Sequence, residues 1–292
     1  MNTKVFPIIP LFRTTRDEII QILKRCPPSY NKPLFVLNED NQALSEYLNI
    51  LKKENEINLF EIPFQVGKAE AIRCGLEFLL MKYSPSIILQ LDSHLKQPPE
   101  ETIELIKMLE DENLDMVVAN RYKFQNLAKY EHRSHVSSFC SKALNELTGY
   151  ELRDVLCGTR AYRKNLAEKF LHLRTFGYGL EVEQIIIAFL NHYKVGDAAI
   201  HSKPQDEATN AGKIEDNLYT LLVYANDLGM SNAARNLIHH ILVMIKRRIS
   251  FMVDLSELGI NANTRFEYNN EFSIDRDNYS SGTSKDGYKI KT

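Results

Sequence analysis

The residues best suited to chemistry lie directly after an apolar run in the first third of the chain. Ile87-Ile88-Leu89 leads into Gln90-Leu91-Asp92-Ser93-His94, and Pro98-Pro99-Glu100 follows. The apolar run predicts a buried strand, and Pro-Pro-Glu predicts a helix start, because proline lacks the N–H that would be unpaired there. Ligands of open α/β sheets bind outside the carboxyl ends of the strands. Asp92 is therefore expected at a binding crevice, and its alternative role is to cap the following turn.

Other polar residues also follow predicted strands or open predicted helices. Asn38-Glu39 and Arg121 each follow an apolar run, and Gly67-Lys68 precedes a stretch of helical period. A helix start with a lysine places N–H groups and a cation near an anionic ligand, and an arginine fork binds phosphate in a bidentate manner. Residues of these types are able to contact a phosphate group. A solvated loop and a surface ion pair are the simpler interpretations of Lys68 and Arg121.

The elements that must position these residues alternate along the first 200 residues. We predict strands at 5–9, 34–37, 57–62, 87–91, 116–119 and 197–201, and helices at 15–24, 42–53, 68–83, 99–109, 135–147 and 180–193. Such alternation indicates βαβ crossovers and a largely parallel sheet flanked by helices. The sequence therefore predicts the α/β class.

The C-terminal part has a different pattern. Residues 215–255 read as helical, and residues 261–292 are polar, rich in Asn, Ser, Asp and Tyr, and without clear period. We predict three parts: an α/β domain over 1–212, a helical extension over 213–255 and a polar tail over 256–292.

Composition excludes several classes of protein. With 36 basic and 38 acidic residues the net charge is −2, which gives no reason to expect nucleic acid as a partner. The 4 cysteines are widely spaced and form no CxxC pair, as in proteins with reduced intracellular thiols. The first residues form neither a secretory signal nor a membrane span. We therefore expect a cytoplasmic protein.

Five segments in order resemble the family 2 glycosyltransferases, and the dolichyl- or polyprenyl-phosphate sugar transferases most. The segments are Gly67–Gly75, the Asp92 segment, Asp115–Tyr122, Asp154–Arg163 and Gly177–Glu183. The resemblance implies a GT-A fold, which is Rossmann-like, a nucleotide-sugar donor, a divalent metal and inversion at the anomeric carbon. It covers residues 55–200 well and the first 50 weakly.

The resemblance also implies roles for individual residues. It places Pro10, Asn38, Glu39, Lys68, Asp92, Lys96 and Arg133 near the donor, and Arg121, Asp154, Arg160 and Glu181 at the reaction centre or acceptor side. Asp154 and Arg160 are expected to form a buried pair, which is catalytic or purely architectural. Breaking a sugar–diphosphate bond leaves negative charge on the departing nucleotide, so cations, a metal or N–H donors are needed beside it.

The metal site departs from the family pattern. His94 stands where relatives have a second acidic ligand, and Lys96 stands where they have an amide. Imidazole suits later transition metals better than Mg²⁺, so a metal held by Asp92 and His94 is expected to be Mn²⁺ rather than Mg²⁺. In an alternative, the Lys96 ammonium replaces part of the metal's charge.

The acceptor decides whether a general base is needed. A lipid phosphate such as a polyprenyl phosphate is already ionised at neutral pH, whereas a hydroxyl must lose a proton to Asp154, Glu181 or Glu183. Glu181 and Glu183 also open an apolar helix, where carboxylates suit the positive end of the dipole without any catalytic role.

The segment 237–253 is apolar and carries the basic cluster Lys246-Arg247-Arg248. It suits a helix on the anionic inner face of a membrane, and equally one that packs on its own domain or in a homodimer. Two other functions compete with sugar transfer. One is a non-catalytic relative that binds a nucleotide or sugar at a degenerate metal site. The other is a nucleotidyltransferase, which the glycine-free run Pro10–Thr14 disfavours.

Overall fold

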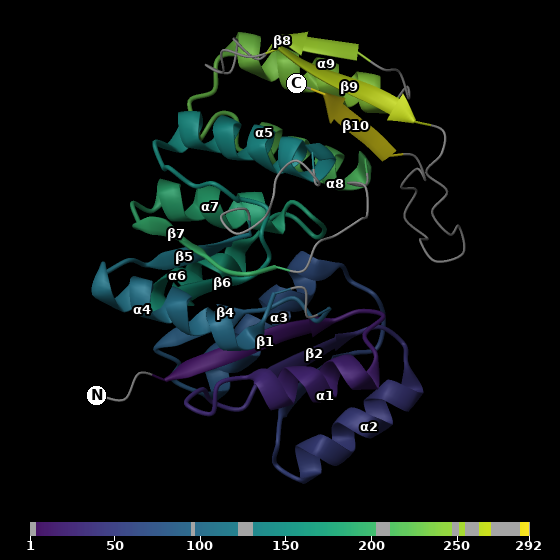
Figure 1. Ribbon diagram of the computed structural model, residues 1–292, viewed down its shortest axis with the longest axis vertical. Helices are drawn as coiled ribbons and strands as arrows, with labels where there is room; N and C mark the ends of the chain where they lie inside the picture. Colours follow the sequence, from purple (N-terminus) through teal and green to yellow (C-terminus); the bar gives the residue numbers. More distant parts are fainter. Residues whose placement is uncertain are drawn as a thin grey trace.

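The computed structural model describes residues 4–94, 97–121, 131–202, 211–246, 251–254, 263–269 and 287–291. Its centre is a seven-stranded sheet of order β3-β2-β1-β4-β6-β5-β7 (Figure 1). The strands are β1 (Val5–Leu11), β2 (Leu34–Asn38), β3 (Asn58–Ile62), β4 (Ile87–Gln90), β5 (Met116–Asn120), β6 (Arg160–Arg163) and β7 (Val195–Ala199). Only β6 runs antiparallel to its neighbours in this sheet, which confirms the predicted mostly parallel arrangement.

Strand β6 was not predicted. It lies within Asp154–Arg163, and its four residues, Arg-Ala-Tyr-Arg, carry charge at both ends instead of an apolar run. Pairing with β4 on one side and β5 on the other makes it a strand, because β4 pairs with all four of its residues and β5 with three. The strand therefore depends on tertiary context that periodicity does not reveal.

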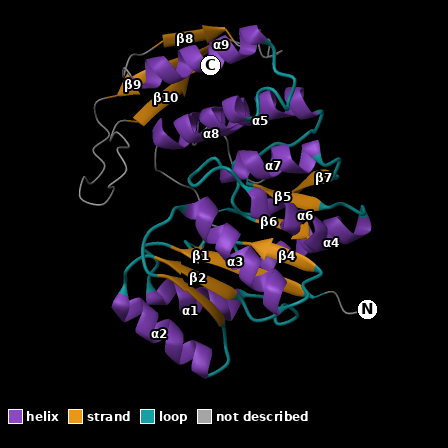
Figure 2. Cartoon of the chain, turned by 180° about the vertical axis from the view of Figure 1, so that it is seen from behind, coloured by secondary structure: helices purple, strands orange, loops and turns teal. Residues whose placement is uncertain are grey.

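Helices cover both faces of the sheet. The bounds are α1 (Arg16–Arg25), α2 (Gln42–Lys53), α3 (Lys68–Lys82), α4 (Ile103–Asp111), α5 (Glu131–Thr148), α6 (Lys164–Lys169) and α7 (Leu180–Leu190), with 3₁₀ turns η1 (Pro99–Thr102) and η3 (Phe170–His172). Helix α1 lies in front of the sheet in Figure 1 and α3 lies in front of it in Figure 2, so these two cover opposite faces. The predicted start at Pro99 is a 3₁₀ turn that continues into α4.

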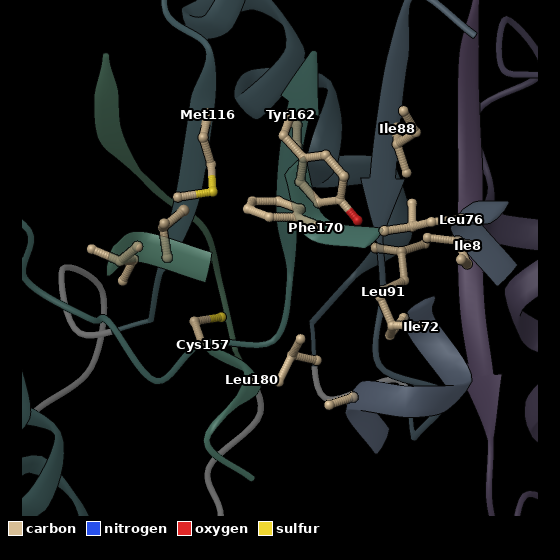
Figure 3. Close-up of a cluster of buried hydrophobic side chains, with 14 of the residues drawn as sticks. Ile8, Ile72, Leu76, Ile88, Leu91, Met116, Cys157, Tyr162, Phe170 and Leu180 are labelled. Carbon is tan, nitrogen blue, oxygen red and sulfur yellow. The ribbon is translucent and has the colours of Figure 1, made fainter. Parts of the chain in front are cut away.

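The buried core extends from the sheet to Cys157 and to Leu180 at the start of α7. Figure 3 shows side chains from β1, β4 and β6 meeting those of α3 and η3, with the Tyr162 and Phe170 rings edge to face at 5.0 Å. Cys157 and Leu180 belong to the same cluster. All four cysteines are free, and burial raises the pKa of Cys157 to about 12, so its thiol stays protonated. Close packing in this part of the core gives rigid support to the neighbouring residues Gly158 and Glu181.

The C-terminal residues form two helices and a second sheet. Helices α8 (Ala211–Val223) and α9 (Asn232–Lys246) pack on each other, and the antiparallel strands β8 (Phe251–Asp254), β9 (Asn263–Asn269) and β10 (Gly287–Lys291) follow. The helical prediction is thus wrong over β8. The segment 261–292 contains two strands where we expected no regular structure, although Phe266 with Tyr268 and Tyr288 with Ile290 alternate with polar residues.

The apolar side of α9 faces the interior of its own chain. Ile238 and Ile241 are fully buried, and Leu242 is 8% exposed. This favours the interpretation in which the segment packs on its own domain over one in which it lies on a membrane. No helix in the described part of the chain is both long enough and apolar enough to cross a bilayer. The division of the chain at residues 212 and 255 stays a prediction.

Candidate active site

A lysine joins two carboxylates where three elements converge. Lys68 is the first residue of α3, Asp92 comes two residues after β4, and Glu181 is the second residue of α7. The Lys68 Nζ lies 2.7 Å from Asp92 Oδ1 and 2.6 Å from Glu181 Oε1. The side chains of Lys68 and Asp92 remain 23% and 29% exposed, so solvent or a ligand reaches them. The binding crevice expected at Asp92 stays a prediction.

The three charges stabilise one another in their ionised forms. Burial by itself raises the pKa of Asp92, but the Lys68 ammonium, its hydrogen bond and the charge of Arg121 lower that pKa to about 2. Burial lowers the pKa of Lys68, and the charges of Asp92 and Glu181 more than compensate, so this pKa is above its usual value. Lys68 is therefore a fixed cation at neutral pH, as charge stabilisation of a leaving phosphate requires.

The Lys68–Asp92 pair packs directly against the backbone of Gly158. A Cβ at this position would lie 2.5 and 2.6 Å from the two Asp92 carboxylate oxygens and 2.7 Å from Lys68 Nζ. The Gly158 carbonyl accepts a hydrogen bond of 3.0 Å from Gln90 Nε2, which fixes the backbone there. The backbone thus approaches the ion pair closely at Gly158, and any side chain there would displace the Asp92 carboxylate.

The loop 174–178 closes one side of the site. Glu183 accepts hydrogen bonds from the backbone N–H groups of Arg174 and Thr175, at 2.6 and 2.9 Å. Asp216 of α8 accepts one from Tyr178 N at 3.0 Å. The Phe176 carbonyl in turn accepts the Ala69 N–H of α3 at 3.2 Å. Carboxylates on two helices therefore hold the loop against the helix that carries Lys68.

Arg121 and Asp154 form a buried bidentate ion pair. Arg121 Nε lies 2.6 Å from Asp154 Oδ2, and Nη2 lies 2.8 Å from Oδ1. The expected pair of Asp154 with Arg160 is wrong. Arg160 is fully buried and donates to the carbonyls of Val155, Cys157 and Glu181, at 2.8 to 3.0 Å. Its guanidinium therefore fastens a turn to the start of α7 and does not face a ligand.

A cleft opens at the carboxyl ends of β1, β2 and β3. Its volume is about 610 Å³, and it is lined by Phe12, Arg13, Glu39, Asp40, Pro63, Phe64 and Gln65. Glu39 accepts the Arg13 N–H through Oε2 at 3.1 Å, while its Oε1 is buried with no partner in the described structure. An unpartnered buried carboxylate oxygen is costly and marks a place for a ligand donor.

Two other residues expected near the donor have structural contacts instead. The Asn38 amide accepts from Val66 N at 2.8 Å and donates to the Gly67 carbonyl at 3.3 Å, so it shapes the loop before Lys68. Pro10 lies in β1 opposite Val36 of β2. Lys96 lies outside the described residues. Arg133 lies in α5, but its side chain is outside the part that the structure describes.

His94 is close to Asp92 but contacts a different element. Its Nδ1 lies 3.2 Å from Glu18 Oε1 on α1, and its side chain is 45% exposed. No group of three His, Cys, Asp or Glu side chains with metal-binding geometry occurs among the described residues. Among the described residues, the chain therefore offers a metal two ligands at most here, the Asp92 carboxylate and the His94 imidazole. Such a partial set fits a cation that takes its other ligands from phosphate oxygens.

Sequence reasoning missed three residues of this region. Glu18, Gln90 and Asp216 contact His94, Gly158 and Tyr178 respectively. Glu18 had a readable signal, since Thr15-Arg16-Asp17-Glu18 is a capping-box sequence that marks a helix start. Gln90 is a polar residue at the end of an apolar run, which is a weaker signal. Asp216 had none, because its partner is 38 residues away.

Comparisons with known proteins identify the family that this chain resembles. The family described as Glycosyl transferase family 2 matches residues 29–171. An uncharacterized protein of Methanocaldococcus jannaschii is 29% identical over 191 residues, which is 61% of this chain and 78% of that protein. The undecaprenyl-phosphate 4-deoxy-4-formamido-L-arabinose transferase of Yersinia pestis is 32% identical over 106 residues, 36% of this chain. The matched region is 30% of that transferase's length.

A solved structure shows the same fold. Glucosyl-3-phosphoglycerate synthase from Mycobacterium tuberculosis, in complex with Mn²⁺, UDP and glucosyl-3-phosphoglycerate, superposes with a TM-score of 0.59. The match has 14% sequence identity and covers 79% of this chain and 81% of that chain. The predicted fold is therefore confirmed for the α/β part of the molecule.

Proposed function

Because the chain belongs to the family 2 glycosyltransferases, we propose that it transfers a sugar from a nucleotide-sugar donor to an acceptor, with inversion at the anomeric carbon. The observation that carries the proposal is the Lys68–Asp92 ion pair at the carboxyl end of β4, whose two side chains remain partly exposed. A fixed cation at a helix start, within reach of a ligand, suits a diphosphate that gains charge as the sugar leaves.

The donor nucleotide is proposed to lie in the cleft at the ends of β1, β2 and β3. Glu39 Oε1 is an acceptor for a ribose hydroxyl or a base N–H. The loop that lines the cleft at Pro63, Phe64 and Gln65 runs directly into Gly67 and Lys68. A nucleotide in the cleft therefore points its diphosphate toward the Lys68 ammonium and the N-terminal end of α3.

The residues fit a divalent metal at the diphosphate, and we propose that Asp92 and His94 would hold it. A carboxylate with an imidazole is a donor set that favours Mn²⁺ over Mg²⁺. A bound metal supplies Lewis-acid stabilisation of the departing diphosphate. Lys68 supplies part of the same charge from the protein itself, since its Nζ is already in contact with Asp92.

The acceptor is proposed to be a phosphate, as in a polyprenyl phosphate. Glu181 is paired with Lys68 and Asp154 with Arg121, so two of the candidate bases are held in ion pairs. The third, Glu183, receives two backbone N–H groups. This arrangement favours an acceptor that is already ionised and needs no base.

Two exposed aromatic side chains support an acceptor with an apolar chain. Phe176, on the loop 174–178, is 67% exposed, and Tyr219 of α8 is 63% exposed. Asp216 connects the two segments through Tyr178 N, and Tyr219 comes three residues after Asp216 in the same helix. Phe176 lies on the loop that contacts the start of α3, and Tyr219 lies on the helix that holds this loop. We propose that the two rings contact the first isoprene units. Contact of the protein with a membrane face stays a prediction.

The proposal is tested by measuring release of nucleoside diphosphate from a panel of nucleotide sugars, with Mn²⁺ and with undecaprenyl phosphate or simple sugar phosphates as acceptors. We expect turnover with one donor and one phosphate acceptor, and loss of turnover in Asp92→Ala and Lys68→Ala. Glu104→Gln, in an exposed ion pair with Lys107, serves as the control. Binding of a nucleotide without turnover for any pair would contradict the proposal and support the non-catalytic alternative.

A further inference from the structure

The turn that carries Asp92 and His94 is braced by the start of α1. The hydroxyls of Thr14 and Ser93 form a buried hydrogen bond of 2.8 Å, and these residues are 5% and 3% exposed. Ser93 therefore cannot turn without breaking a contact with the segment that leads into α1. The hydrogen bond fixes the backbone on either side of Ser93, and with it the direction in which its two neighbours project.

Glu18 holds the second contact between α1 and the turn. Its two carboxylate oxygens have different partners: Oε2 accepts the Thr15 N–H at 2.8 Å and the Thr15 hydroxyl at 2.9 Å, while Oε1 lies 3.2 Å from His94 Nδ1. The Thr15 hydroxyl in turn accepts the Glu18 N–H at 3.2 Å, which completes the capping box. The carboxylate is thus fixed in place by the helix start and is not a freely rotating surface group.

These contacts select the ring nitrogen that remains available. The Glu18 carboxylate is a hydrogen-bond acceptor only. His94 Nδ1, 3.2 Å away, therefore donates its N–H, and in the neutral imidazole the lone pair is then on Nε2. A carboxylate on one ring nitrogen that directs the other toward a metal is a recurring arrangement in metalloproteins, and it raises the basicity of the ligand.

We propose that Glu18 is a positioning residue for the metal, which orients His94 so that Nε2 and the Asp92 carboxylate bind one Mn²⁺ ion. The inference rests on the proposed function only in assigning a divalent metal to the donor diphosphate. It explains why a histidine replaces a second carboxylate at this position: the missing negative charge is supplied by Glu18, behind the imidazole. The ion would then have two protein ligands, Asp92 and His94, and Glu18 would hold His94 in place.

The test is Mn²⁺ affinity of the full chain, measured by the EPR signal of free Mn²⁺, with Mn²⁺ alone and with UDP. We expect His94→Ala and Glu18→Ala to weaken binding, the latter by on the order of 10- to 100-fold. Glu18→Gln keeps one acceptor oxygen, which can serve either the helix cap or Nδ1, so its loss of Mn²⁺ affinity should be smaller than that of Glu18→Ala. Melting temperatures establish that each variant is folded.

Two controls separate metal positioning from general effects. Thr15→Ala weakens the same helix cap without removing the acceptor of His94. Glu101→Gln alters a second Glu–His pair, in which Glu101 Oε1 lies 2.8 Å from His201 Nδ1, next to the edge strand β7. Both should bind Mn²⁺ within about two-fold of wild type, which is roughly 0.4 kcal/mol. Nitrogen-15 NMR of labelled histidine should show His94 protonated at Nδ1, with Nε2 broadened first as Mn²⁺ is added.

The results distinguish this inference from the function on which it builds. The role of Glu18 would be overturned if Glu18→Ala bound Mn²⁺ as tightly as Glu101→Gln does. It would also be overturned if the wild-type protein bound no Mn²⁺, with or without UDP. Mn²⁺ binding that depends on Glu18, in a chain that transfers no sugar, would leave the role of Glu18 intact and overturn the transferase proposal.

Discussion

Arg121 and Asp154 meet across 33 residues as a bidentate ion pair with almost no solvent contact, the carboxylate being fully buried. Removing one member leaves the other as an uncompensated charge. We therefore expect Asp154→Asn to lower the free energy of unfolding by about 3 to 5 kcal/mol. Urea denaturation measures this. Lys107→Met, in the exposed pair with Glu104, should change stability by less than about 1 kcal/mol. A small effect of Asp154→Asn would show that the pair is not a structural necessity.

Gly158→Ala should remove activity while the protein stays folded. The added methyl group would lie 2.5 Å from Asp92 Oδ1, so the carboxylate must move, and displacements of this size lower kcat/KM by on the order of 100-fold. Gly149→Ala is the matched control, because its Cβ meets nothing within 4 Å but its φ is +73°. That variant should lose about 1 kcal/mol of stability and no activity. Equal kcat/KM for Gly158→Ala and wild type would argue against a site at Asp92.

Glu183→Gln should raise KM for the acceptor more than KM for the donor. A carboxamide has one oxygen, so it can accept only one of the N–H groups of Arg174 and Thr175 that Glu183 now binds. The loss of a charged hydrogen bond predicts a rise of roughly 10-fold in acceptor KM. Tyr224→Phe removes only a hydroxyl donor to the same carboxylate and should have a smaller effect. Steady-state kinetics with both substrates varied provides the comparison, and an unchanged acceptor KM would contradict a role for the loop in acceptor binding.

Asp216 should make stability fall as the pH rises through its pKa. Burial raises this pKa above 3.8, the Tyr178 N–H lowers it in part, and repulsion from Glu215 raises it again. A carboxyl group with a raised folded-state pKa favours the folded state most when it is protonated, below its unfolded pKa. That contribution is lost as the group ionises above the raised pKa. Asp216→Asn should therefore be more stable than wild type at pH 7, and the difference should vanish below pH 3.8, as unfolding curves at several pH values will show.

His94→Asp should shift metal preference toward Mg²⁺. The change replaces an imidazole by an oxygen ligand, which Mg²⁺ prefers. We expect the ratio of kcat/KM with Mn²⁺ to kcat/KM with Mg²⁺ to fall several-fold, measured after chelation and re-addition of each metal. His192→Asp, at an exposed position after α7, is the control for added negative charge. An unchanged ratio would show that residue 94 does not contact the metal.

The parts of the fold that were predictable are those set by local pattern. Apolar runs with helical stretches between them predicted six strands of the large sheet, because burial of such runs dominates local structure. The run Arg160–Arg163 and the alternating pattern of β9 and β10 were missed, since their ladders come from distant partners. Amino-acid composition did not indicate a strand at Arg160–Arg163, at β9 or at β10.

The candidate site was predictable as a place and less so as a set of contacts. Asp92 and Lys68 were named from the sequence, and the structure brings them together beside Gly158. The partner of Asp154 was not predictable, because Arg160 is near in sequence while Arg121 is near in space. The His94 contact with Glu18 spans 76 residues and required the fold.

The first turn of α7 has a consequence for protein engineering. Glu181 reaches Lys68 on one side, and Glu183, two residues later, fastens the loop 174–178 on the other. The Lys68 side chain and the loop 174–178 are thus both held by the first turn of α7. A change in the geometry of that turn would displace both of them. A graft designed to change the acceptor should therefore transfer residues 174–184 together. Exchanging the loop alone would separate it from the Glu183 carboxylate that fixes its shape.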